Sequence, residues 1–120
     1  MSEMNMIVLD ITGGVHLTTP VSAEPGIRLV QWSIKDCGFP DGTRARHLVG
    51  FDSVNHEGRV SSEIVEFDNV KMHVITSTGR VYALVGASGQ NGDADYVWNR
   101  WKQIYQVTNE ADVSIEELLQ

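Results

Sequence analysis

A glycine-rich stretch between a strand-like and a helix-like segment is the part of this sequence whose spacing comes closest to chemistry. Three glycines follow the apolar residues 81–85, and Asp93 begins a segment with helical periodicity. Glycines expose backbone N–H groups and a helix N-terminus attracts anions, so such a loop can hold phosphate. The candidate ligand residues of the loop are Gly86, Ser88, Gly89, Asn91 and Gly92.

The same stretch carries features that oppose phosphate binding. Its spacing is G-x-x-G-x-x-G, which differs from both the G-x-G-x-x-G and the P-loop patterns. Asp93 and Asp95 would also place two carboxylates where the oxygens of a phosphate would lie. We therefore expect a plain connector, and we keep a small-molecule or phosphoryl-ligand site at this loop as an alternative function.

No residue pattern indicates catalysis, a cofactor or a metal ion. Asn91, Asp93 and Asp95 could attract a hard cation such as Ca²⁺, but the EF-hand pattern is missing. Cys37 could be an exposed thiol, but the sequence places no residue to activate it. Metal-ligand spacing is also missing from the four histidines, which are His16, His47, His56 and His73. We expect no catalytic, cofactor-binding or metal-binding residues, which favours a protein that is not an enzyme.

Tryptophan, tyrosine and arginine are unusually prominent, and these are the residue types enriched in protein interfaces. The simpler interpretation is that Trp32 and Trp101 form the core while the arginines pair with the many carboxylates. Trp98 is the residue that we most expect to be exposed for a partner. The candidate partner-binding residues are Trp98, Arg59, Arg80, Tyr82 and Arg100. The first functional hypothesis is therefore a small module that binds another protein or itself.

Composition sets the outer limits of the interpretation. The 120 residues are 42% hydrophobic and carry a net charge of −7, which predicts one acidic globular domain spanning residues 1–120. An acidic surface argues against direct binding to nucleic acid, although an acidic inhibitor of a nucleic-acid-handling protein remains a second alternative. No apolar run is long enough to cross a membrane, and the N-terminal segment lacks the basic region of a secretory signal. With Cys37 as the single cysteine, a cytoplasmic location is expected.

The central part of the chain, residues 44–86, predicts a four-stranded antiparallel meander. Apolar and polar residues alternate in four segments separated by short turns, as they do in strands buried on one face. The alternation breaks within the second segment, which indicates either a bulge or a strand that is covered on both faces. The predicted strands are residues 45–51, 59–67, 71–76 and 80–85.

The segments that precede the meander predict further strands. Residues 6–12 and 15–18 flank Gly13-Gly14 and indicate an N-terminal hairpin within residues 1–19. Residues 20–26 are a proline-punctuated link, and a strand is expected over residues 27–34. The turn-forming composition of residues 36–43 predicts a loop.

A helix is expected after the glycine-rich stretch, from Asp93 as its N-cap to Gln106. Its apolar stripe contains Val97, Trp101, Ile104 and Tyr105, and Trp98 lies beside that stripe. Residues 107–120 form an acidic tail in which Ser114 and Glu117 match a capping box at the start of a short helical turn. We expect this turn to dock on the domain, with a recognition segment as the alternative.

These elements define an α+β, mainly β fold class. About five to seven strands form a curved antiparallel meander, and one C-terminal helix packs on its open face because the sheet must cover its apolar side. The phrases RHLVG, EGRVSSEIVEFD, TSTGRVYALVG and ADYVWNRW, between Arg46 and Trp101, loosely resemble small uncharacterised bacterial proteins. That resemblance implies no activity, cofactor or binding residue.

Overall fold

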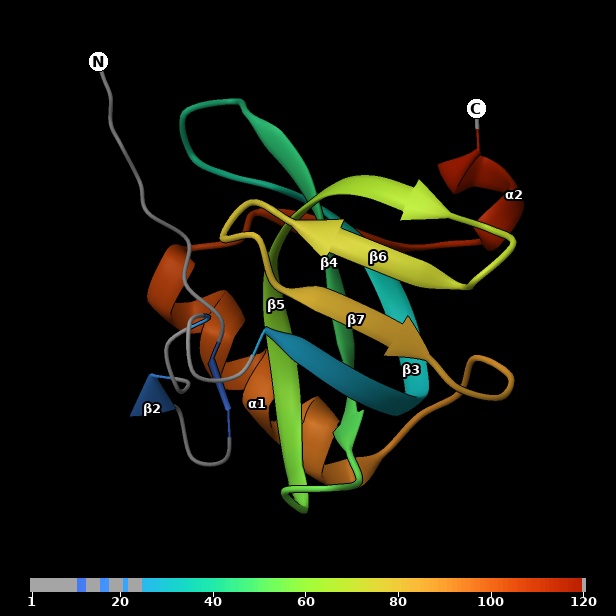
Figure 1. Ribbon diagram of the computed structural model, residues 1–120. Coiled ribbons are helices and arrows are strands. Elements are labelled where there is room, and N and C mark those ends of the chain that lie inside the picture. The colour runs from blue at the N-terminus through green and yellow to red at the C-terminus, as the bar shows by residue number, and fades with distance from the viewer. Residues whose placement is uncertain (1–10, 13–15, 18–20, 22–24, 120) are drawn as a thin grey trace.

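The computed structural model describes residues 11–12, 16–17, 21 and 25–119, and this part of the chain contains an eight-stranded sheet and two helices (Figure 1). The α+β, mainly β fold class predicted from the sequence is confirmed. Neither helix in these residues is long and apolar enough to cross a membrane.

The predicted meander is present. Strands β4 (Arg44–Asp52), β5 (Glu57–Asp68), β6 (His73–Thr76) and β7 (Val81–Leu84) pair in chain order, and each pair is antiparallel. The phase break in β5 is a bulge, because its register against β6 shifts between Ile64 and Glu66.

Strand β3 (Gly26–Gly38) closes the sheet. It pairs with β4 along one edge, and the start of its other edge pairs with β7 in parallel. Strands β3, β4, β5, β6 and β7 therefore form a ring of five. The sheet is mixed rather than wholly antiparallel, because neighbours in a ring with an odd number of strands cannot alternate in direction throughout.

Strand β3 is also longer and more bent than its sequence suggests. The bend lies at Gln31, where φ is 46° and the register against β4 shifts. The predicted loop over residues 36–43 is wrong in its first part, because residues 36–38 pair with both β4 and β8 (Asn109–Val113). The turn itself begins at Phe39, whose N–H donates to the carbonyl of Thr43 at 3.0 Å. Pairing on both edges overrides the local preference for a turn.

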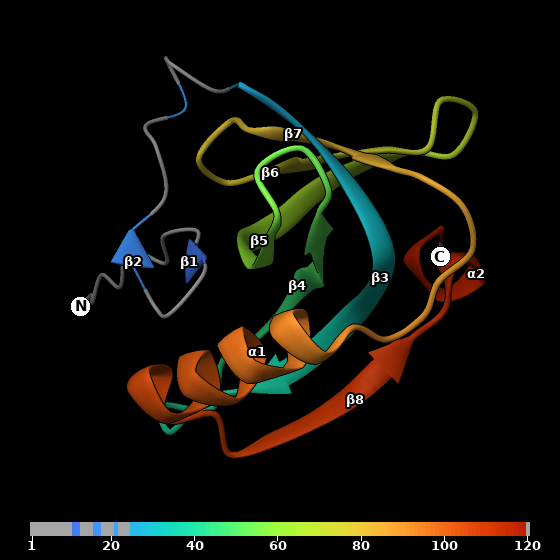
Figure 2. The same cartoon turned by 90° about the horizontal axis from the view of Figure 1, so that it is seen from below.

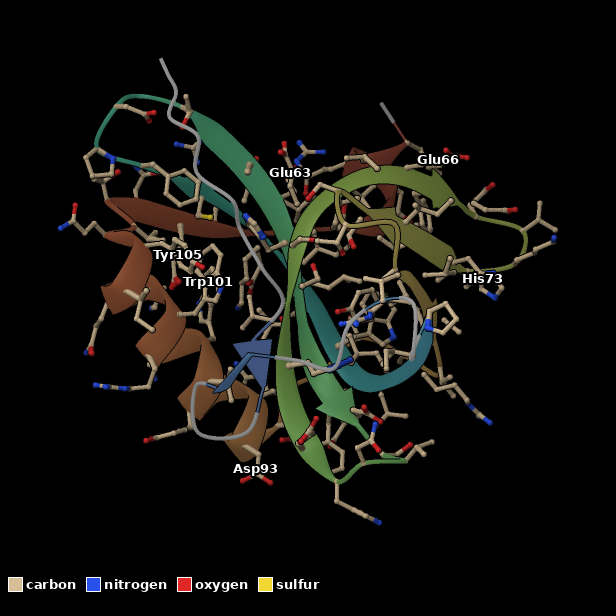
Figure 3. All side chains as sticks on the ribbon, turned by 60° about the vertical axis from the view of Figure 1, so that its left-hand side comes forward. Glu63, Glu66, His73, Asp93, Trp101 and Tyr105 are labelled. Carbon is tan, nitrogen blue, oxygen red and sulfur yellow. The ribbon has the colours of Figure 1, made fainter. Side chains whose placement is uncertain are left out.

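Helix α1 (Gly92–Tyr105) lies against β4 and β5 (Figure 2). Its N-cap is Asn91 rather than Asp93, because the Asn91 side chain accepts a hydrogen bond from the Ala94 N–H at 3.0 Å. The predicted apolar stripe was rotated from the real one, since Ile104 is 50% exposed whereas Trp98 is 3% exposed. Figure 3 shows Trp101 between the helix and the strands.

Two apolar clusters occupy opposite faces of the same strands. The helix-side core lies beneath α1 and contains Cys37, Phe39, Val49, Val60, Ala94, Val97, Trp98 and Trp101. The interior core fills the ring and contains Ile27, Leu29, Trp32, Ile34, Leu48, Val74, Tyr82 and Leu84.

The two ends of the chain add short elements to this ring. Strand β1 (Ile11–Thr12) pairs with β2 (His16–Leu17) as the predicted hairpin requires, and β1 also pairs with β5. The rest of the predicted hairpin and most of the predicted link, at residues 6–10, 13–15, 18–20 and 22–24, lie outside the described residues. At the other end, β8 pairs with β3 and leads into α2 (Ile115–Leu118), where the predicted capping box of Ser114 and Glu117 is present.

Candidate functional site

The bend of β3 leaves a gap between two strand partners. Along one edge, β3 pairs with β7 up to Leu29 and with β8 from Ile34 onward. Among the described residues, no strand pairs with residues 30–33 on that edge. The connector after β7 runs past instead, with the N–H of Val85 donating to the Leu29 carbonyl and that of Gly89 to the Trp32 carbonyl, each at 2.9 Å.

A hollow of about 390 Å³ lies beside this gap, and we call it the β3 hollow. The connector forms one wall and the junction of β8 with α2 forms the other, on the side of β3 where the two segments converge in Figure 2. Its lining residues are Trp32, Ser33, Ile34, Lys35, Ser88, Gly89, Gln90, Asp112, Val113, Ser114, Ile115 and Glu116. Pockets that hold small organic molecules are commonly of about 300–1,000 Å³, so the volume suits such a ligand.

The lining combines apolar and polar residues. Trp32 and Ile34 belong to the interior core, and Val113 and Ile115 pack against that core. The Trp32 ring is held in place because its Nε1–H donates to the Gly86 carbonyl at 3.1 Å. Apolar surface with a few fixed polar groups is the usual composition of a small-molecule site.

Lys35 and Asp112 form an ion pair at the rim. Lys35 Nζ donates to Asp112 Oδ1 at 2.6 Å, and the Asp112 side chain is 71% exposed. Ser114 is engaged in the capping box, where its N–H donates to Glu117 Oε1 at 2.9 Å. Glu116 is exposed in the first turn of α2.

The five residues of the candidate ligand loop have different roles in the structure. Ser88 and Gly89 line the β3 hollow, but the Gly89 N–H is already used by β3. Gly86 accepts from Trp32, Asn91 caps α1, and Gly92 is the first residue of the helix.

Backbone groups at the start of α1 are engaged within the fold. A Cβ atom added at Gly58 would lie 2.5 Å from the Asp93 carbonyl oxygen, so the start of α1 is packed tightly against β5. The N–H groups of Ala94 and Asp95 donate to the side chain and the carbonyl of Asn91. The helix N-terminus is therefore capped by Asn91, and its first two residues, Gly92 and Asp93, are exposed.

Four of the five candidate partner-binding residues are buried. Arg59 and Arg80 are each 1% exposed, Tyr82 is 0% exposed, and Trp98 is 3% exposed, which leaves Arg100 as the exposed member. The expectation that Trp98 is exposed was wrong. Its ring stacks on Trp101 with centroids 5.4 Å apart, and its Nε1–H donates to Glu110 Oε2 at 2.8 Å.

Tyr82 and Arg59 are buried within the closed sheet, and Arg80 is buried directly before β7. Tyr82 belongs to the interior core, and Arg59 lies opposite Gly50 in the β4–β5 ladder. Arg59 Nε lies 4.0 Å from Oδ2 of Asp52, which is also buried. An open sheet would have left Tyr82 accessible, whereas the ring covers it.

Cys37 and His47 are both buried close to α1. Burial, and to a lesser extent the neighbouring Asp36 carboxylate, raises the pKa of the Cys37 thiol to about 12. The thiol is therefore protonated and unreactive at neutral pH, and it is not the exposed group that the sequence allowed. His47 Nδ1 lies 2.9 Å from the Ser61 carbonyl, and its ring centroid lies 4.6 Å from that of Trp101. Within the described residues, no group of three or more His, Cys, Asp or Glu side chains could hold a metal ion.

Local sequence patterns do not reveal that the two walls of the hollow lie together. Ser33, Lys35, Asp112 and Glu116 carry no local motif, and Lys35 and Asp112 are 77 positions apart in the chain. The turn-forming composition near residues 85–91 located the connector wall, and the capping box at Ser114 marked the start of α2 without indicating that it faces this connector. The opposite wall depends on the pairing of β8 with β3, for which the exposed residues of β8 offer no apolar pattern.

Comparison with known proteins gives no match to a family model, to a curated protein or to a solved structure.

Proposed function

We propose that this chain is a small ligand-binding protein and that the β3 hollow is its site. The observation that supports the proposal is the interruption in strand pairing at residues 30–33, beside which the hollow opens. A sheet edge with unpaired backbone groups is normally covered or paired. Here the connector covers part of that edge and leaves a space with the size and the mixed lining of a small-molecule site.

Preorganisation of the connector wall and of the floor supports the same proposal. The connector is fixed to β3 through Val85 and Gly89, and the floor residue Trp32 is fixed by its bond to Gly86. A ligand entering a preformed hollow loses less binding free energy to ordering the protein than a ligand that must fold a loop. Because the one cysteine, Cys37, is a buried free thiol, the proposal places the protein in the reducing cytoplasm.

A fragment screen with a filled-site variant tests the proposal. A library of small organic cations, neutral molecules and anions is added to the full chain, and the thermal unfolding midpoint is recorded. Ligands that bind the native state raise that midpoint. We expect several fragments to raise it for the natural chain and none of those to do so for Ser88→Trp, in which the indole occupies the hollow.

The matched control is Ser53→Trp, which adds the same side chain at an exposed turn residue outside the hollow. Its response to the fragments should equal that of the natural chain. A library that never raises the midpoint, or fragments that act equally on the Ser88→Trp variant, would overturn the proposal.

Binding of another protein is the second candidate, and the outer face of α1 supports it. Tyr96 is 56% exposed, Ile104 is 50% exposed, and the exposed Arg100 lies between them at helical spacing. These are interface-enriched types on one helix face. If this face joins two copies of the chain, the mass measured by light scattering should rise with concentration, and Tyr96→Ala should abolish the rise. A constant monomer mass would exclude self-association.

A further inference from the structure

The charges around the β3 hollow indicate the class of ligand. We propose that the hollow binds a small organic cation, a protonated amine carried on an apolar body. This inference rests on the proposed function and adds the chemistry of the ligand to it.

The lining is poorly suited to an anion. Lys35 is the one basic residue among the described residues that line the hollow, and its ammonium group is already held by Asp112 at 2.6 Å. The N–H groups of Gly89 and Ser114 also donate within the fold. An anion would meet the carboxylates of the rim, with neutral donors such as the Ser33 and Ser88 hydroxyls and the Gln90 side-chain amide to compensate.

The lining is well suited to a cation. Asp112 and Glu116 place two carboxylates on the β8–α2 wall, against the single ammonium of Lys35. The hydroxyl groups of Ser33 and Ser88 can accept further hydrogen bonds from an ammonium group. Hydrogen bonds between charged partners are about twice as strong as neutral ones. The net charge of −7 also raises the local concentration of cations around the molecule.

The apolar part of the lining indicates which kind of group the amine of the ligand is attached to. The partly buried Val113 and Ile115 contribute apolar surface behind the polar rim, and the buried Trp32 and Ile34 lie beneath it. A ligand that consists of an ammonium group alone would leave this surface in contact with water. The combination selects an amine attached to an aliphatic or aromatic group small enough for about 390 Å³.

Lys35 and Glu116 should act in opposite directions on such a ligand. Lys35→Gln removes the competing ammonium group and frees the Asp112 carboxylate, so amine binding should become tighter. Glu116→Gln removes a carboxylate from the rim, so amine binding should become weaker by about three- to tenfold. Opposite signs from two neighbouring rim variants are expected from charge recognition and not from a general loss of structure.

Benzylamine, benzyl alcohol and benzoate provide the test, because they share an aromatic body and are cationic, neutral and anionic at neutral pH. Each is titrated into the full chain, and the backbone amide signals of Ser33, Ser88 and Val113 are followed by NMR. We expect benzylamine to bind most tightly and benzoate most weakly, with a smaller difference at high salt. Glu66→Gln removes a carboxylate outside the hollow and should leave the benzylamine affinity unchanged.

Equal affinities for the three probes, a preference for benzoate, or equal effects of Lys35→Gln and Glu116→Gln would overturn the cation assignment. So would a failure of all three probes to move these amide signals. The proposed function would survive these outcomes if the fragment library still raised the unfolding midpoint of the natural chain but not that of Ser88→Trp. It would fall together with the cation assignment if the library also had no effect.

Discussion

Two segments pack against the five-stranded ring after β7, and they are attached in different ways. Helix α1 buries Ala94, Val97, Trp98 and Trp101. Helix α2 contains no buried residue, and the first four residues of β8 are exposed. The first segment is therefore attached mainly by apolar burial. The second is attached by its backbone ladder with β3, by polar contacts and by the partly buried side chains of Val113, Ile115 and Leu118.

The polar contacts of the tail recur along its length. Cationic side chains of the ring and of α1 reach four of its residues, in the pairs Lys102–Glu110, Lys35–Asp112, Arg44–Asn109 and Arg46–Glu117. Exposed contacts of this kind each contribute little and weaken with salt. We infer that α1 is the fixed side of the molecule and the tail the side that opens more readily.

The β3 hollow lies between these two sides of the molecule. One of its walls belongs to the tail, and the other is the connector that ends at the fixed helix. A wall that is held by weak contacts can adjust to a ligand, while the rigid floor of Trp32 and Ile34 keeps its shape. The variants below test this contrast between the two sides, beginning with the largest expected effect.

Trp101→Ala should remove most of the attachment of α1. The side chain is 0% exposed and contacts the rings of His47, Trp98 and Tyr105. Truncating a buried tryptophan costs about 3–5 kcal/mol through lost burial and the cavity left behind. Urea unfolding measures the loss, and Ile104→Ala on the half-exposed face should cost far less. A loss for Trp101→Ala below about 1 kcal/mol would contradict the fixed role of α1.

Gly58→Ala should push α1 away from β5. The added Cβ would lie 2.5 Å from the Asp93 carbonyl oxygen and 2.6 Å from the Ala94 nitrogen, both of which are backbone atoms. Overpacking of this kind costs about 1–3 kcal/mol, which thermal or urea unfolding measures. Gly89→Ala is the matched control in the connector, because its Cβ would meet its nearest neighbour, the Gln31 Cα, at 3.8 Å. Equal destabilisation by the two variants would show that α1 does not need this close contact.

Acid should loosen the tail. Burial alone would raise the pKa of Glu110, but hydrogen bonds from Lys102 and Trp98 outweigh it and hold the pKa below its ordinary value of 4.5. A carboxylate with a lowered native pKa stabilises the fold above its unfolded pKa, and that contribution disappears as the pH falls through the native value. The Trp98 indole N–H signal should therefore shift as the pH falls from about 4.5 downward.

Glu110→Gln is the control for this titration, since it removes the ionisable group while keeping a hydrogen-bond acceptor. The acid shift of the Trp98 signal should be absent in that variant. The account of the tail contacts would be wrong if the signal of the natural chain stayed constant through this pH range, or if the variant reproduced the shift.

Asp112→Asn should have the smallest effect on global stability. The ion pair with Lys35 is short, but the Asp112 side chain is 71% exposed, so its loss should cost about 0–1 kcal/mol. Amide hydrogen exchange should detect the change locally, as faster exchange in β8 with unchanged exchange in α1. Equal acceleration in both segments would contradict the separation between the two sides.

Much of the fold could be predicted from local patterns. Alternating residues and short turns predicted the meander, and the capping box at Ser114 predicted the start of α2. The parallel pair between β3 and β7 could not be predicted, because no local pattern reports that a curved sheet closes on itself. Arg59, Arg80 and Tyr82, which the sequence had suggested for a surface, are buried, and Tyr82 belongs to the core that this closure encloses.

The candidate site was less predictable than the fold. The glycine-rich loop was predicted as a connector with a ligand site as the alternative; Ser88 and Gly89 of this loop line the hollow, while the start of α1 packs against Gly58. Trp98 could not be assigned to the buried face of α1 from the sequence. A small rotation of the helix about its axis decides whether Trp98 or Ile104 faces the core. The β8 wall arises from a ladder between distant and mostly polar segments, which only the tertiary structure reveals.

Mapping of a bound fragment on the full chain tests the central claim most directly. Two-dimensional NMR is recorded with the fragment that raises the unfolding midpoint most. The account predicts that the largest amide shifts fall in residues 32–35, 88–90 and 112–116, which come from the three segments that line the hollow. Shifts centred on the outer face of α1, around Tyr96 and Arg100, with none at those three segments, would contradict it.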